Sequence, residues 1–100
     1  MLTLEQVLAT RVEARRRRRD PNCRHDQEMH LRLLTTWERD RPRMWASLMA
    51  HGREVADDMA FVAQQRMLER QAVLMHAGMP VMDAREMAER EHLLLTPEAN

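Results

Sequence analysis

The chain has 100 residues, of which 44% are hydrophobic and 32% charged, and its formal net charge at pH 7 is zero. This composition is too apolar for a wholly disordered chain, and the length suits one domain with a single small core. Only two glycines and four prolines occur, too few for the regularly spaced turns of an all-β chain. We therefore predict an all-α fold over residues 1–100, a small irregular helical bundle of about four helices with one long central helix and a frayed tail from about residue 96.

The composition also disfavours several cellular settings. No apolar stretch follows a basic start, as in a secretory signal, and no apolar run approaches the length of a membrane span. A single cysteine, Cys23, excludes an intramolecular disulfide. All 16 basic residues are arginine, and lysine, isoleucine and tyrosine are absent, which is typical of a GC-rich bacterial or phage gene. We expect a cytoplasmic protein without membrane contact.

The first predicted helix begins after Thr3, which opens the capping-box pattern T-L-E-Q. Leu4, Val7 and Leu8 share one face at the helical period, and we expect this face to pack on the core. Pro21 cannot continue a helix and restricts the residue before it, so the helix should end shortly before that position.

A second helix is predicted over residues 25–39, because apolar side chains recur at every fourth position from Met29 through Leu33 to Trp37. The segment E-R-D-R-P-R interrupts this pattern, and Asp40 is the expected cap of the next helix.

Residues 43–76 contain no proline and one glycine, Gly52, and keep a helical pattern of apolar side chains. A single helix of this length is long for such a small domain. Either Gly52 or the polar Q-Q-R stretch interrupts it, or a partner covers the excess. The segment H-A-G-M-P ends it, with Gly78 suited to a left-handed cap. The last helix is expected from Asp83, where Glu86 completes a second capping box.

Five consecutive arginines, residues 15–19, lie at the end of the first predicted helix. The expected core face of this helix continues onto Arg11 and then into the arginine run. A buried guanidinium without a partner is too costly, so this end of the helix must enter water or meet carboxylates. The first fifty residues carry eleven arginines against seven acids, and the remainder five against nine. The run is therefore either solvated or paired with the acidic second half.

Two functional hypotheses compete with this internal pairing. The arginines could form a docking surface for an acidic protein, or they could neutralise nucleic-acid phosphates. The zero net charge and the presence of only three aromatic side chains argue against nucleic acid. The candidate binding residues are the same for both hypotheses: Arg11, Arg15, Arg16, Arg17, Arg18, Arg19 and Arg24.

Methionine is unusually frequent, with ten in the chain, most of them in its second half. Methionine fills irregular gaps in a core, and it also adapts to the surfaces of partners. Both roles are open, and the second predicts a homodimer or another protein complex. The interface candidates are Trp45, Met59, Met67 and Met75.

Cys23, His25 and His30 form the pattern C-x-H-x4-H, which is a weak candidate for a metal site. Zinc takes these ligand types, but the spacing is loose and a fourth ligand is not evident. No orienting acid or glycine-rich oxyanion loop accompanies the cysteine. Asp57 and Asp58 are adjacent on a helix, so they point in different directions and are expected to be solvated. We predict no metal, no cofactor and no enzymatic activity.

The sequence thus predicts a non-enzymatic helical interaction protein that binds a macromolecular partner, either an acidic protein surface or a nucleoprotein complex. Its small size also suits an inhibitor or adaptor encoded by a phage or another mobile element. The long helix and its methionines would organise the interface, while the arginines steer association. The alternative is a nucleic-acid-binding accessory protein that contacts phosphates through residues 15–19.

Overall fold

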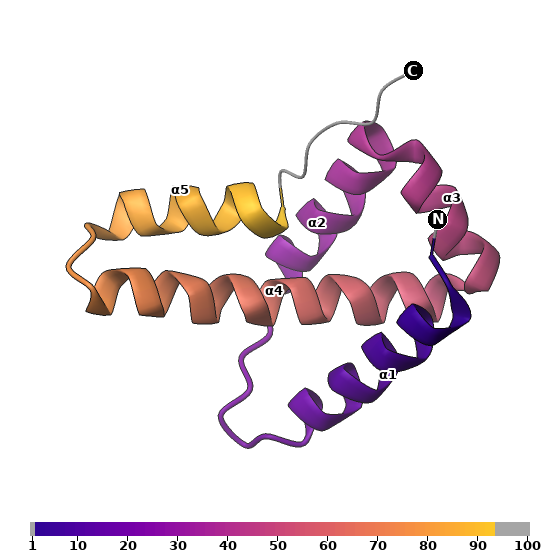
Figure 1. The fold of residues 1–100 in the computed structure, drawn as a ribbon, viewed down its shortest axis with the longest axis horizontal. Helices are drawn as coiled ribbons and strands as arrows, with labels where there is room; N and C mark the ends of the chain where they lie inside the picture. Colours follow the sequence, from indigo (N-terminus) through magenta and orange to yellow (C-terminus); the bar gives the residue numbers. More distant parts are fainter. Residues whose placement is uncertain (1, 94–100) are drawn as a thin grey trace.

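The computed structural model describes residues 2–93, and within them the chain forms five helices and no strand (Figure 1). In chain order the helices are α1 (Leu4–Arg18), α2 (Gln27–Asp40), α3 (Pro42–His51), α4 (Arg53–His76) and α5 (Val81–His92). The all-α class is confirmed, with five helices in place of about four. The tail that the sequence predicts from about residue 96 lies outside the described residues. No helix among those described has the length and apolarity to cross a membrane.

The longest helix, α4, lies at the centre, and each of the other helices packs against it (Figure 1). Its buried side chains extend from Val55 to Leu74 and are not confined to one stripe, because neighbouring helices cover different faces. Trp37 of α2, Leu48 of α3 and Leu93 after α5 are at most 1% exposed and meet in the main core. Burying each of these side chains contributes roughly 2 to 3 kcal/mol.

Gly52 divides the segment that the sequence leaves open as one helix or two. It ends α3 and begins α4 with φ of 118° and ψ of 151°, a conformation that is essentially restricted to glycine. Its N–H donates to the carbonyl of Leu48 at 3.1 Å, and its carbonyl accepts from the N–H of Val55 at 3.1 Å. The chain therefore changes direction at one residue while these backbone groups stay paired, and the Q-Q-R stretch remains helical.

Two other helix ends form as their sequence signals predict. The Thr3 hydroxyl accepts from the N–H of Gln6 at 3.2 Å, and the Gln6 side chain accepts from the N–H of Thr3 at 2.9 Å, which completes the capping box. At the end of α4, Gly78 has φ of 102° and donates its N–H to the carbonyl of Met75 at 3.0 Å. These signals are local, so the sequence is sufficient to predict them.

The predicted caps of the third and last helices are wrong. Asp40 is the final residue of α2, and its carboxylate lies 2.8 Å from Arg39 instead of capping α3. Pro42 starts α3, where its fixed φ favours the first helical turn. Pro80 precedes α5. Asp83 lies in the first turn of this helix, where the helix dipole interacts favourably with its negative charge. Pro42 thus begins α3 and Pro80 immediately precedes α5, where acidic caps are predicted from the sequence.

The face of α1 that packs on the core also differs from the prediction. Val7 and Ala14 are 5% and 0% exposed, whereas Leu4 and Leu8 are 65% and 55% exposed. Ala14 packs against Phe61 of α4, and its small side chain allows the two helices to approach closely. The predicted core face is therefore wrong for Leu4 and Leu8, and the apolar side chains of α1 fall on two different faces.

Candidate binding site around the arginine block

The arginine block lies against α4, where a nearly buried carboxylate holds two of its guanidinium groups. Arg18 donates through Nη1 to Oδ1 of Asp58 at 2.6 Å, and Nε of Arg11 lies 3.3 Å from the other oxygen of Asp58. Glu54 lies 3.3 Å from Arg11. The side chain of Asp58 is only 11% exposed, so its predicted solvated position is wrong. Burial of this carboxylate is tolerated because two cations compensate its charge.

A second ion-pair network joins the C-terminal half of α1 to α4 through Glu13. Its carboxylate accepts from Nε of Arg17 at 2.8 Å and from Nη2 of Arg66 at 2.5 Å. Arg17 pairs with Glu69 as well. Burial raises the pKa of Glu13, but hydrogen bonds and charges from Arg66 and Arg17 outweigh burial and hold this pKa below its ordinary value. The hydrogen bond to Glu69 raises the pKa of Arg17.

Arg18 makes a further contact with an aromatic ring. Its Cζ atom lies 4.5 Å from the centroid of the Phe61 ring, and Phe61 is 2% exposed. A guanidinium over an aromatic face contributes roughly 0.5 to 1 kcal/mol at a site open to solvent. Arg18 is thus fixed both by the Asp58 carboxylate and by the Phe61 ring.

The remaining arginines of the predicted binding set have no anionic partner among residues 2–93. Their side chains are exposed, and they form no ion pair or hydrogen bond with any residue of the described chain. We call them the free arginines: Arg15, Arg16, Arg19 and Arg24. The structure therefore splits the predicted set into side chains neutralised by carboxylates of α1 and α4 and side chains directed to solvent.

Two of the free arginines, Arg15 and Arg19, line a groove of about 500 Å³ between α1 and the first turns of α4. The groove has four arginines and three acidic residues in its walls, so it keeps a positive charge after internal pairing. The other lining residues are Arg11, Arg18, Glu54, Asp57 and Asp58. An anionic group that enters the groove meets guanidinium donors that have no partner within residues 2–93.

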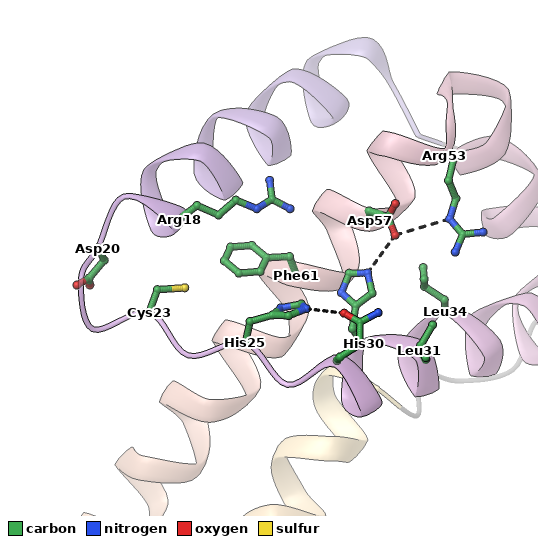
Figure 2. A pocket seen from close by; sticks show the side chains of 11 residues that line it. Arg18, Asp20, Cys23, His25, His30, Leu31, Leu34, Arg53, Asp57 and Phe61 are labelled. Carbon is green, nitrogen blue, oxygen red and sulfur yellow. Dashed lines mark hydrogen bonds and ion pairs between the residues drawn. The ribbon is translucent and has the colours of Figure 1, made fainter.

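A neighbouring pocket of about 650 Å³ lies between the α1–α2 connection, α2 and α4 (Figure 2). Arg18 and Asp57 line both this pocket and the groove. His30 is 7% exposed, and its Nε2 atom lies 3.0 Å from Oδ1 of Asp57, which is also 3.6 Å from Nε of Arg53. The ring of His25 lies beside that of His30, with centroids 5.1 Å apart. The walls contain positively and negatively charged side chains, so the pocket does not favour either anionic or cationic ligands.

The three residues of the weak metal candidate line this pocket without forming a ligand set. Cys23 packs against the cluster that contains Phe61. The Nε2 atom of His25 is 3.1 Å from the Gln27 side chain, and that of His30 contacts Asp57. Within residues 2–93, no group of three or more histidine, cysteine, aspartate or glutamate side chains is arranged to hold a metal ion.

Sequence reasoning missed two glutamines that fix the connection between α1 and α2. Gln64 is 1% exposed, its amide donates to the carbonyl of Asp26 at 2.7 Å, and its oxygen accepts from the N–H of Asp26 at 3.1 Å. Gln65 donates to the carbonyl of Arg24. The sequence signal is that Gln64 and Gln65 directly follow a run of apolar residues in the same helix. Amides buried at such positions need hydrogen-bond partners elsewhere in the chain. These two residues hold the backbone next to Arg24 in place.

The predicted interface residues differ in their exposure. Met67 is 6% exposed within the main core, while Trp45 and Met59 are partly buried against that core. Met75 is 40% exposed. Met67 therefore acts as core filler, the other role that the sequence leaves open for methionine, and Met75 presents the most exposed side chain of the four.

Comparisons with protein-family models, with curated proteins and with solved structures find no match to this chain. What the protein does must therefore be inferred from its own charges and surfaces.

Proposed function

We propose that this chain is a non-enzymatic interaction protein that binds an acidic surface of a protein partner through the free arginines. One observation supports the proposal. Arg15, Arg16, Arg19 and Arg24 are exposed and lack an anion among the described residues, although the whole chain carries as many acidic as basic residues. The acidic side chains of α4 neutralise their neighbours and leave these four groups for an external anion.

The anchoring of α1 makes these arginines suitable for binding. The contacts of Asp58 and Glu13 fix the helix backbone against α4, so the guanidinium groups extend from a rigid support. A guanidinium can form two parallel hydrogen bonds with one carboxylate. Such charges chiefly accelerate association and select the partner, since exposed ion pairs add little free energy individually.

Nucleic acid is the alternative anionic partner, and this chain has fewer of the features that bind nucleic acid. Trp37 and Phe61 are 1% and 2% exposed, and Trp45 is partly buried. Residues 2–93 therefore present no fully exposed tryptophan or phenylalanine ring on which bases could stack. The phosphate backbone also favours proteins with a net positive charge, whereas this chain is neutral.

The same proposal gives the protein a mode of action. An inhibitor or adaptor of a nucleoprotein complex could use the free arginines to occupy an acidic protein surface in that complex. Self-association stays a separate prediction, and Met75 is the most exposed of its four candidate residues.

The test compares the full-length chain with a triple variant, Arg15→Gln, Arg16→Gln and Arg19→Gln. The probes are fluorescent poly-L-glutamate and duplex DNA, measured by anisotropy over a salt series. We expect the chain to bind polyglutamate more tightly than DNA and the triple variant to lose about tenfold in affinity or more. A double variant of exposed α5 arginines, Arg85→Gln and Arg90→Gln, is the matched control and should bind as the unmodified chain does.

Two outcomes would overturn the proposal. Binding of neither probe at low salt would show that the free arginines do not form a binding surface. Tighter binding of DNA, with a steep loss of affinity as salt rises, would favour the nucleic-acid alternative.

A further inference from the structure

The outer face of α1 carries an apolar stripe that leads directly into the free arginines. Leu4, Leu8 and Val12 follow one another at four-residue spacing and are 65%, 55% and 66% exposed. Because successive helical residues turn by about 100°, the same face continues onto Arg15 and Arg19. Both of these side chains are exposed. The stripe therefore has an apolar part followed by a cationic part along roughly 22 Å of helix.

The apolar part of this outer stripe is separate from the face that α1 uses within the fold, whereas Arg15 and Arg19 also line the groove between α1 and α4. Val7 and Ala14 are buried, and Arg11 and Arg18 bind Asp58 of α4. The two stripes lie about a quarter of a turn apart on the helix. The α4-facing stripe holds α1 in place, while the outer stripe exposes three large aliphatic side chains, an arrangement that marks interaction surfaces.

We propose that the outer stripe binds one amphipathic helix of the protein partner. The apolar side chains of that helix cover Leu4, Leu8 and Val12, and its carboxylates meet Arg15 and Arg19. Side chains repeating at four-residue spacing form a ridge that fits the groove of another helix. The inference rests on the proposed function and adds the shape and chemistry of the partner.

A second copy of α1 does not complement this stripe. In a parallel pair related by two-fold symmetry, Arg15 and Arg19 would face their own counterparts. In an antiparallel pair the same arginines would face Leu4 and Leu8, and Glu5 would be the one carboxylate near that end for two arginines. The occupant must carry acidic groups that the stripe itself lacks.

Other anionic surfaces also match the stripe less well. Phosphates of a nucleic acid would leave the three aliphatic side chains exposed to water. A helix that lies on an anionic membrane places cations along the polar face beside its apolar stripe. Here the cations follow the apolar residues on the same stripe, and the exposed carboxylate of Glu5 lies near its N-terminal end. A helix with apolar residues followed by acidic residues fits both parts.

The test uses the full-length chain and two synthetic helical peptides of about 18 residues, long enough to span the stripe. One peptide places leucines at four-residue spacing and glutamates further along the same face. The other has the same composition in scrambled order. We expect the patterned peptide to bind about tenfold more tightly than the scrambled one. We also expect methyl chemical-shift changes at Leu4, Leu8 and Val12.

The variant that separates this inference from the proposed function carries Leu4→Gln, Leu8→Gln and Val12→Gln. It should lose the preference for the patterned peptide while still binding polyglutamate. Val81→Gln with Met82→Gln removes apolar side chains that are 53% and 74% exposed on α5 and should change neither measurement. Circular dichroism checks that each variant remains folded.

The inference is overturned if the unmodified chain binds both peptides equally or if the triple glutamine variant keeps the preference. Displacement of the patterned peptide by anionic vesicles or duplex DNA at equal charge concentration would also overturn it. In all three cases intact binding of polyglutamate would leave the proposed function standing. Loss of polyglutamate binding by the unmodified chain would remove both.

Discussion

Arg18 and Asp58 lie 40 positions apart in the sequence and form a hydrogen-bonded ion pair of 2.6 Å. The side chain of Asp58 is 11% exposed, whereas that of Arg18 is 47% exposed. The guanidinium therefore covers a nearly buried carboxylate, whose charge it compensates together with Arg11. Packing of α1 on α4 depends on this charge as well as on the apolar contacts of Val7 and Ala14.

Replacing Asp58 with asparagine should lower the free energy of unfolding by about 2 to 3 kcal/mol, because two guanidinium groups lose their shared anion. Urea unfolding followed by circular dichroism measures the change. Glu54→Gln is the matched control, since its carboxylate is 84% exposed and bonded to the same Arg11. This control should cost less than about 1 kcal/mol. Equal losses in the two variants would show that the buried carboxylate has no special role.

Glu13→Gln should make stability less dependent on pH. The native pKa of Glu13 is lowered, so its ionised form stabilises the fold above the unfolded pKa. This contribution is lost as pH falls through the lowered native pKa. We expect the variant to be about 1 to 2 kcal/mol less stable at neutral pH and the difference to shrink below about pH 5.

Urea unfolding at a series of pH values measures this difference. The control is Glu38→Gln on α2, because the exposed Glu38 side chain forms no ion pair with the described residues. Its effect on the free energy of unfolding should stay within about 0.5 kcal/mol, because no ion pair is removed. A Glu13 variant that keeps a constant deficit down to about pH 3 would contradict the lowered pKa.

Gln64→Ala should loosen the connection between α1 and α2. The substitution removes both hydrogen bonds to the backbone of Asp26 and leaves a small cavity, so we expect a loss of about 2 to 3 kcal/mol. Amide hydrogen exchange should accelerate most at Asp26. Gln71→Ala is the comparison, because that side chain makes only a 3.9 Å contact with the sulfur of Met75. Unchanged exchange at Asp26 would count against this role of Gln64.

Gly52→Ala should destabilise the fold by about 1 to 3 kcal/mol through its backbone conformation alone. Beyond Gly52 and its two chain neighbours, no described atom lies within 4 Å of the position that an added Cβ would take, so the cost comes from φ of 118° and not from a clash. Thermal unfolding measures the loss. Gly78→Asn should cost less, because asparagine tolerates the left-handed cap better than other residues do. A neutral Gly52 variant would mean that the junction of α3 and α4 adopts another geometry.

The parts of the fold that could be predicted from sequence depend on neighbouring residues. Thr3 with its capping box and Gly78 with its helix-ending turn need only a few adjacent positions, and both form as predicted. A break at Gly52 is one of three interpretations that the sequence allows for residues 43–76. Choosing it requires knowing that α3 packs against α4 after the turn, which no local pattern reveals.

The buried face of α1 could not be predicted because hydrophobicity alone does not determine it. Leu4 and Leu8 are the more apolar residues, yet Ala14 and the cation of Arg18 face α4. A guanidinium is accepted there only because Asp58 lies opposite it, and that pairing joins distant parts of the sequence. The carboxylate partner was expected from the charge asymmetry of the chain, but its identity and burial required the three-dimensional structure.

The turn between α4 and α5 lies at the far end of the molecule from the N-terminus (Figure 1). Ala77, Gly78 and Pro80 are exposed there, and such turns tolerate inserted sequence. An affinity handle or fluorescent domain introduced after Gly78 would tether the molecule by the end opposite to the start of α1. Immobilised in this orientation, the chain would present its N-terminal helix unobstructed to candidate ligands.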